Sequence, residues 1–276
     1  MKLLKYIGTS VLLGALLSSE SVVFAGDNSK NSITPSRKDA IALMKSVCGR
    51  SNVNSDNLDS CKQCPSFTES AGSGGTLNSV IYGSFTKAGT REALVDMEGC
   101  QGHSGNWGGS ILLRSTTKGW SVVRYERALR SYRCLKFRTR AGRNSLVCEG
   151  SYTQGGFTHT WLDAIEISST KNTITHLLEV SSNMGSCRPP YYERGITDFT
   201  SIDTNKDGVN DLVIKVSEAT EPKYISRAED QLCDSQLPKP TIHQLTFLFN
   251  GQLFKPTTET VKLLKQVYTT NSHFSS

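Results

Sequence analysis

The chain has 276 residues and a formal charge of +6, a positive charge too small and too dispersed to indicate nucleic-acid binding. Hydrophobic residues make up 37% of it, and its 23 glycines suit a protein with many short strands and turns. No segment reaches the roughly 18 consecutive apolar residues that a transmembrane helix needs.

The first 25 residues have the features of a Sec-type signal peptide. A basic start is followed by an apolar run from Val11 to Leu17 and by a small-x-Ala motif that ends at Ala25. We predict cleavage after Ala25 and export to the periplasm, the cell surface or the medium. All eight cysteines lie beyond this point, and disulfides are typical of the oxidising compartments that exported chains enter.

Residues 26–66 form an N-terminal segment with one predicted helix and a cysteine pair. We expect the helix over residues 35–48, because Thr34 and Pro35 are typical of a helix start and apolar residues then recur at helical spacing. Gly49 is typical of a helix end.

The sequence Cys61-Lys62-Gln63-Cys64-Pro65 follows. A Cys-x-x-Cys pair can be a thioredoxin-like redox site, but that motif needs a strand before it and a helix after it. Here a polar loop precedes the pair and Pro65 follows it, and no second Cys/His pair supports zinc. We therefore prefer a structural role, in which one of Cys61 and Cys64 bonds Cys48 and the other bonds Cys100.

Residues 67–276 predict a mostly β domain built from repeats, because short apolar runs alternate with Gly, Asn and Ser clusters. Three related units lie at about 77–130, 131–192 and 193–256, each with a strand, a glycine loop, a second strand and a further hairpin. Four antiparallel strands of this length are the content of one β-propeller blade. We predict three blade-like four-stranded sheets and a C-terminal helix at about 258–268.

The loop Asp203–Asp211 in the third unit carries the clearest chemical signal. Oxygen-bearing side chains occupy its first, third, fifth and ninth places, and Gly208 at the sixth permits a positive φ. Ca²⁺ takes six to eight oxygen ligands, and one tight loop can supply most of them. The alternative is a metal-free turn rich in Asp and Asn. We predict one structural calcium ion, held by the side chains of Asp203, Asn205, Asp207 and Asp211 and by the backbone carbonyl of Val209.

This loop, with Phe199 before it and an apolar run at 212–214 after it, resembles the FG-GAP (VCBS-type) repeat. That repeat builds the β-propeller of integrin alpha-subunit heads and of many bacterial surface proteins. The resemblance is good over 196–216 and weaker over 81–96 and 134–149. It implies that the loop joins the first two strands of a blade and binds calcium. Because propellers have four to eight blades, either a fourth blade is disguised or the sheets stack without closing a ring.

The equivalent loops of the first two units lack enough anionic oxygen for tight calcium binding, which is why we predict one ion. Aligned on the glycine, their ligand places hold Ser84, Thr86, Ala88, Thr90 and Glu92 in the first unit and Phe137, Thr139, Ala141, Arg143 and Ser145 in the second.

Two further disulfides are predicted within the repeats. Cys134 and Cys148 are symmetric about the centre of the second glycine loop, so a tight hairpin places them opposite each other, within disulfide reach. Cys187 and Cys233 flank the third unit, and we expect them to pair across its long insertion.

The segment Cys100–Gly109 is the most unusual loop of the chain. His103 and Trp107 in this loop, with Tyr125, are candidates for a ligand-binding surface; the alternative is a tight connection fixed by Cys100. The arginine-rich stretch 124–143 is interpreted as a solvated strand face, with an anionic partner as the alternative.

The function that these patterns favour is an exported, calcium-stabilised β-repeat protein that binds or scaffolds a protein or glycan partner, without catalysis. One alternative is a secreted hydrolase with structural calcium and a site near His103. A less favoured one is a thiol–disulfide protein that uses the Cys-x-x-Cys pair.

Overall fold

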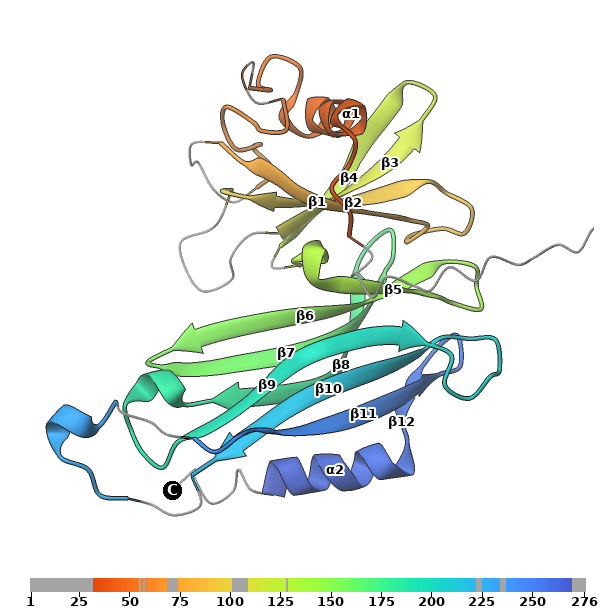
Figure 1. Ribbon diagram of the computed structural model, residues 1–276. Helices are drawn as coiled ribbons and strands as arrows, with labels where there is room; N and C mark the ends of the chain where they lie inside the picture. Colours follow the sequence, from red (N-terminus) through yellow and green to blue (C-terminus); the bar gives the residue numbers. More distant parts are fainter. Residues whose placement is uncertain are drawn as a thin grey trace, which may run out of the picture.

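The computed structural model of the chain consists of two antiparallel β-sheets with a helix against each (Figure 1). The predicted signal peptide lies outside its described part. The described residues are 32–54, 56, 58–68, 74–100, 109–127, 129–221, 225–233 and 237–269.

The first sheet is a meander of four strands in chain order. One face is covered by helix α1 (Arg37–Cys48), whose Leu43 and Met44 are fully buried in the core that the helix shares with the sheet. The strands are β1 (Thr76–Gly83), β2 (Glu92–Glu98), β3 (Gly109–Thr116) and β4 (Gly119–Arg127).

Helix α1 begins two residues later than the predicted start. Its N-cap is Ser36, whose hydroxyl oxygen accepts a hydrogen bond from the backbone N–H of Asp39 at 3.2 Å. Serine and threonine compete for the capping role, and the second candidate along the chain has it here. The predicted end at Cys48, followed by Gly49 with a positive φ of 80°, is confirmed.

The second sheet has eight strands, and each pairs with the next along the chain. It curls until its first hairpin touches its last turn. The backbone N–H of Arg140 donates to the carbonyl of Gly251 at 2.8 Å, and the rings of Phe137 and Phe254 lie 4.9 Å apart. The strands are β5 (Cys134–Arg138), β6 (Asn144–Gln154), β7 (Phe157–Ile167), β8 (Asn172–Ser182), β9 (Tyr192–Ile202), β10 (Asp211–Thr220), β11 (Thr241–Phe249) and β12 (Phe254–Pro256).

Helix α2 (Thr258–Thr269) confirms the predicted C-terminal helix. Buried Thr260 fixes it to β11, because its hydroxyl accepts from the N–H of Thr246 at 2.7 Å and donates to the carbonyl of the same residue at 3.0 Å. Leu263 and Leu264 add apolar surface to the core inside the curled sheet.

Three apolar cores hold the helices and sheets together. The middle core lies between the two sheets, so strands that border it bury side chains on both of their faces. Along β2, Ala93 and Val95 pack toward α1, whereas Leu94 between them packs toward the second sheet. On the second sheet, Leu146 and residues of β7 complete this middle core. Side chains alternate across a strand, so a continuous apolar run is what a strand buried on both faces requires.

The three predicted units correspond to β1–β4, β5–β8 and β9–β12, but they are not three separate sheets. The second and third units are joined edge to edge by one residue pair, Ser182 with Glu193. The cause is a short connection in which Asn183 donates to the carbonyl of Pro190 at 3.0 Å and accepts from the N–H of Tyr192 at 2.8 Å. This connection brings β9 back beside β8. In the described residues the sheets form no closed ring, and no fourth four-stranded unit is found.

All eight cysteines are paired, and the pairs agree with the expected ones, with the choice between Cys61 and Cys64 that the sequence leaves open decided by the structure. Cys48 bonds Cys61 and Cys64 bonds Cys100, so the segment before β1 is fastened to the first sheet rather than forming a separate unit. The other two pairs are Cys134–Cys148 and Cys187–Cys233. Four disulfides indicate an oxidising, exported environment.

Candidate functional site

The three glycine loops occupy the same place in their units, between the first and second strands. Their glycines share the left-handed conformation, with φ of 73° at Gly89, 71° at Gly142 and 84° at Gly208. The residue at the ninth place is buried in each unit: Glu92, Ser145 and Asp211. The loops are therefore structural equivalents, although their sequences share little except the glycine.

In the third loop, the side chains of three predicted ligands fold inward over the loop tip. Asp203 accepts from the N–H of Gly208 at 2.9 Å, and Asn205 accepts from the N–H of Asp207 at 3.0 Å. Asp207 in turn accepts from the N–H of Val209 at 2.8 Å. Carboxylate and amide oxygens are ligands that a hard cation prefers, and in the structure each of them accepts from a neighbouring N–H, including that of the Asn205 amide, which donates to Asp207 at 3.0 Å.

Asp211 has a different environment from the other three. Its side chain is fully buried, and it accepts hydrogen bonds from the N–H and hydroxyl of Thr204 and, at 2.9 Å, from the N–H of Phe249 on β11. Through these hydrogen bonds, Asp211 holds the third loop against β11. Among the residues described, no three His, Cys, Asp or Glu side chains form a group that could hold a metal ion.

In the first loop, a side-chain cation lies beside the carboxylate at the ninth place. Glu92 accepts from the N–H groups of Phe85 and Thr86 at 2.7 and 2.8 Å, and from the guanidinium of Arg114 at 2.9 Å. Burial alone would raise the pKa of Glu92, but the hydrogen bonds from Thr86, Arg114 and Phe85 outweigh it and hold the pKa below its usual value.

The second loop has no acid at its ninth place. Ser145 is buried there, and the described residues offer its hydroxyl no hydrogen-bond partner. The hairpin is closed instead by the disulfide between Cys134 and Cys148, which are directly opposed on β5 and β6. The predicted bond across this loop is thus present in the structure.

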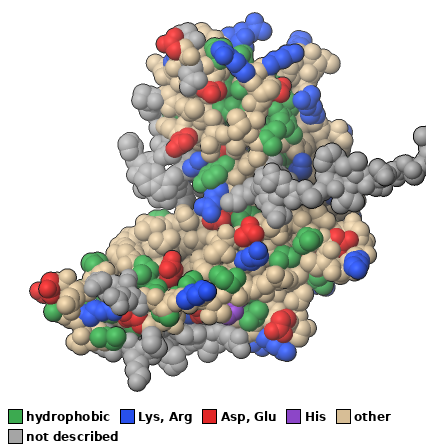
Figure 2. All heavy atoms as spheres, viewed as in Figure 1, with side chains coloured by type: hydrophobic (Ala, Val, Ile, Leu, Met, Phe, Trp, Pro, Cys, Tyr) green, Lys and Arg blue, Asp and Glu red, His purple; other side chains and the backbone are tan. Residues whose placement is uncertain are grey.

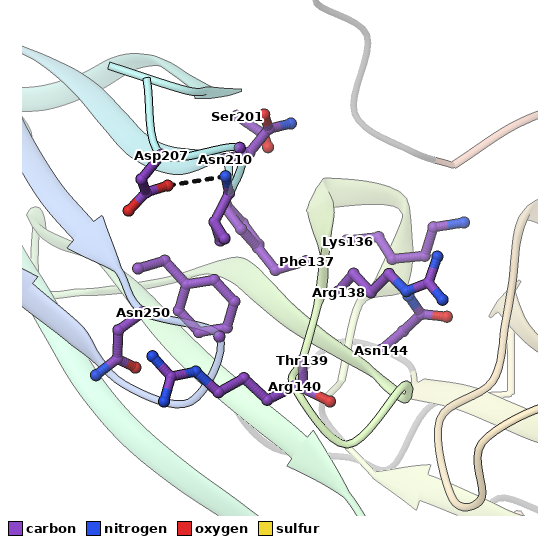
Figure 3. Close-up of a pocket in the computed structure, with 14 residues that line it drawn as sticks. Lys136, Phe137, Arg138, Thr139, Arg140, Asn144, Ser201, Asp207, Asn210 and Asn250 are labelled. Atoms are coloured by element: carbon purple, nitrogen blue, oxygen red, sulfur yellow. Dashed lines mark hydrogen bonds between the residues drawn. The ribbon is translucent and has the colours of Figure 1, made fainter. Parts of the chain in front are cut away.

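A cleft of about 750 Å³ opens between the second and third loops and the Asn250-Gly251 turn. Asp207 and Asn210 line one side and Arg140 the other (Figure 3), and Val209 is also part of the lining. Arg140 extends toward the turn, where a Cβ on Gly251 would lie 2.6 Å from its side chain, so the glycine is required for this approach. The predicted metal loop therefore forms one wall of this cleft.

The arginine-rich stretch is mostly not a solvated face, because its cations have partners. Arg130 pairs with Asp96 at 3.0 Å, Arg133 pairs with Glu149, and Lys136 donates to the carbonyl of Tyr82 at 2.8 Å. Burial lowers the pKa of Lys136. Arg124 and Arg143 also pair, with Glu126 and Glu166, whereas Arg138 and Arg140 are exposed at the cleft.

Charges of both signs are interspersed over the face shown in Figure 2, which agrees with the modest net charge. In the part of the chain that the structure describes, no helix is long and apolar enough to cross a membrane.

The candidate ligand-binding loop is not assembled by the described residues. His103 and Trp107 lie outside them, so the structure does not test the hydrolase alternative, whose site is expected near His103. Tyr125 is on β4, where its ring covers Gly109; a Cβ there would lie 2.5 Å from the Tyr125 hydroxyl. Cys61 and Cys64 bond other cysteines, so they do not form the mutual disulfide of a thioredoxin-like site.

The chain matches no protein-family model, no curated protein and no solved structure. The site therefore has to be interpreted from its own geometry.

The structure also assembles a polar cluster that the sequence did not indicate. His159 lies 2.9 Å from Glu179, and His176 lies 2.9 Å from Asp163. Both pairs join β7 to β8, two strands that the sequence predicts. Their partnership depends on the strand register, including an irregularity between Leu162 and Asp163, which alternation of apolar and polar residues does not encode.

Proposed function

We propose that the chain is an exported, disulfide-braced β-repeat protein of the FG-GAP type that binds a protein or glycan partner and is stabilised by one calcium ion. The repeated strand order and the glycine loop between the first two strands of every unit support the family proposal. The four disulfides support the exported location.

The observation that carries the binding role is the cleft between the second and third loops. Its volume of about 750 Å³ falls in the range of ligand sites, and its rim combines Arg138 and Arg140 with Asp207 and three asparagines. Loops held on rigid sheets commonly carry binding. Since Asp207 and Val209 belong to the cleft wall, order in the third loop sets the shape of the cleft.

Calcium in the third loop would be held by Asp203, Asn205 and Asp207 with the carbonyl of Val209, and Asp211 would anchor the loop or complete the set. The ion would offset the negative charge that these carboxylates concentrate in nine residues. Its chemistry would be structural, because it would tie the β9–β10 hairpin together.

Thermal unfolding with calcium and with EGTA tests the proposal. With calcium at 100 times the dissociation constant, binding stabilises the folded state by about 2.7 kcal/mol. For a chain of this size that raises the melting temperature by about 5–10 °C. The shift should disappear in Asp207→Asn and persist in the control Asp198→Asn, which changes an exposed carboxylate on β9. Equal melts of the wild type in calcium and EGTA would remove calcium from the proposal.

A further inference from the structure

Three neighbouring strands, β6, β7 and β8, carry a set of polar and aromatic side chains on the face that looks toward the first sheet. Nearer the first sheet this face is apolar, because Cys148 and Ile165 belong to the middle core. Side chains two residues apart share a face, so Trp161 and Asp163 continue the row that ends at Ile165. Glu179 on β8 lies directly opposite Trp161.

The indole ring of Trp161 packs against the backbone of its cross-strand partner Gly150. A Cβ on Gly150 would lie 2.5–2.7 Å from three atoms of the indole ring. Any other residue at this position would push the ring away from the backbone. Because the side chain is only partly buried and lines a hollow, part of the ring remains accessible.

Two carboxylates beside the ring are held in place by histidines. The Oε1 of Glu179 lies 2.9 Å from the Nδ1 of His159, and the Oδ1 of Asp163 lies 2.9 Å from the Nδ1 of His176. Each carboxylate has a second oxygen, and a carboxylate offers about four acceptor positions. The histidines therefore orient both acids, and the Oε2 of Glu179 also lies 3.9 Å from the Nε2 of His176. Asp163, with about four acceptor positions, keeps capacity for a ligand.

A hollow of about 190 Å³ lies beside the ring, bordered by Trp161, Asp163 and Ile174 on the sheet and by Leu129 and Arg130 on the segment after β4. It is smaller than the roughly 300–1,000 Å³ of sites for drug-sized ligands. It therefore suits one ring of a longer molecule, and exposed Ile174 extends its apolar border. None of its lining residues lines the cleft at the calcium loop.

We propose that this hollow, with the Trp161 ring beside it, is a groove that binds one pyranose ring of a glycan. A pyranose has an apolar face of C–H groups, which packs on an aromatic ring, and an edge of hydroxyls, which donate to carboxylates. Trp161 supplies the platform. Asp163, which lines the hollow, accepts from the hydroxyls there, and Glu179, opposite Trp161 but outside the lining, accepts at the outer edge of the ring. An aromatic ring bordered by oriented acceptors fits a sugar better than a purely apolar ligand, which would leave Asp163 desolvated.

This inference rests on the proposed binding role but not on calcium. Binding of cellohexaose, chitohexaose, maltohexaose and mannohexaose to the full disulfide-bonded chain can be measured by calorimetry and tryptophan fluorescence. At least one oligosaccharide is expected to bind the wild type, with affinity unchanged in EGTA. Trp161→Ala should weaken that binding by about tenfold or more, and Asp163→Asn and Glu179→Gln should each weaken it by about fivefold.

Trp120→Phe is the matched control, because Trp120 lies on β4 beside Tyr82 and Arg91, away from the groove, and should keep wild-type affinity. Gly150→Ala keeps the indole but displaces it, so it should also weaken binding. Circular dichroism verifies that each variant is folded. Absence of binding by all four oligosaccharides at about 1 mM, or wild-type affinity in Trp161→Ala, would overturn the proposal. Loss of binding in EGTA or in Asp207→Asn would instead place the sugar at the calcium loop, which also overturns it.

Discussion

Replacing Glu92 by Gln tests the idea that a side-chain ion pair closes the first glycine loop. The carboxylate is fully buried, whereas the side chain of Arg114 is 39% exposed. Breaking a buried ion pair by removing one partner costs about 3–5 kcal/mol. Because Arg114 can be solvated and the Gln carbonyl can still accept one backbone N–H, we expect the lower end, about 3 kcal/mol less free energy of unfolding at pH 7.

The pH dependence of this difference follows from the lowered pKa of Glu92. A carboxyl whose folded-state pKa is below its unfolded value stabilises the fold fully above the unfolded value, here 4.5, and the contribution is lost as the pH falls through the folded-state value. The gap in stability between wild type and Glu92→Gln should therefore be constant from pH 7 to about pH 5 and should shrink below about pH 4.5.

Urea unfolding followed by circular dichroism between pH 7 and about pH 3.5 measures both effects. Glu166→Gln is the control, because Glu166 is 38% exposed and lies 3.4 Å from Arg143; such a surface pair contributes about 0–1 kcal/mol. A loss below about 1 kcal/mol for Glu92→Gln at pH 7, or a gap that does not narrow in acid, would refute the reasoning.

Three further changes test other parts of the structure. Replacing Cys134 and Cys148 together by Ser should lower the free energy of unfolding by about 3 kcal/mol, because the bond closes a loop of 14 residues. In this variant a reductant should lower the melting temperature less than it does in the wild type. An equal effect of the reductant on both proteins would contradict this prediction. Gly208→Ala should cost about 1 kcal/mol because its φ is 84° although the space beside it is open, whereas Gly195→Ala should cost less; equal costs would mean that backbone strain is not the cause. Tyr82→Phe should be neutral or stabilising by up to about 1 kcal/mol, because the Tyr82 hydroxyl is buried without a hydrogen-bond partner among the described residues. Burial also raises the pKa of Tyr82, so above pH 10 the wild type should lose more stability than the variant. Thermal melts at alkaline pH measure this difference.

Local patterns in the sequence predict most strands, the glycine loops and the Cys134–Cys148 pair of this fold. The symmetric position of Cys134 and Cys148 about one turn is enough to oppose them, because a tight hairpin fixes its own register. Cys187–Cys233 could be proposed from the positions of its members around the third unit, whereas the sequence leaves the partner of Cys100 open between Cys61 and Cys64. Nothing local fixes the path of the chain between the members of these long-range pairs.

The features that the sequence does not predict depend on strand register within a unit and on how one unit meets the next. The join between Ser182 and Glu193 follows from hydrogen bonds of Asn183 within a short connection, and no periodicity reports it. Arg114 is 22 residues from Glu92, and only the β2–β3 register makes them partners. The tips of the first and second loops also meet, where Asn144 accepts from the N–H of Ser84 at 2.8 Å.

The guanidinium of Arg114 in the first loop is covalently part of the protein, and this distinguishes the loop from its counterparts. A cation that cannot diffuse away cannot be diluted, exchanged or chelated. The closure of the first loop therefore needs neither an oxidant nor a metal ion from the medium at neutral pH. The second relies on an oxidised bond, and the third, on our proposal, on an ion that the surroundings must provide. Outside a cell, the supply of oxidant and of calcium is not controlled for the protein. The three glycine loops would therefore respond to different changes in their surroundings.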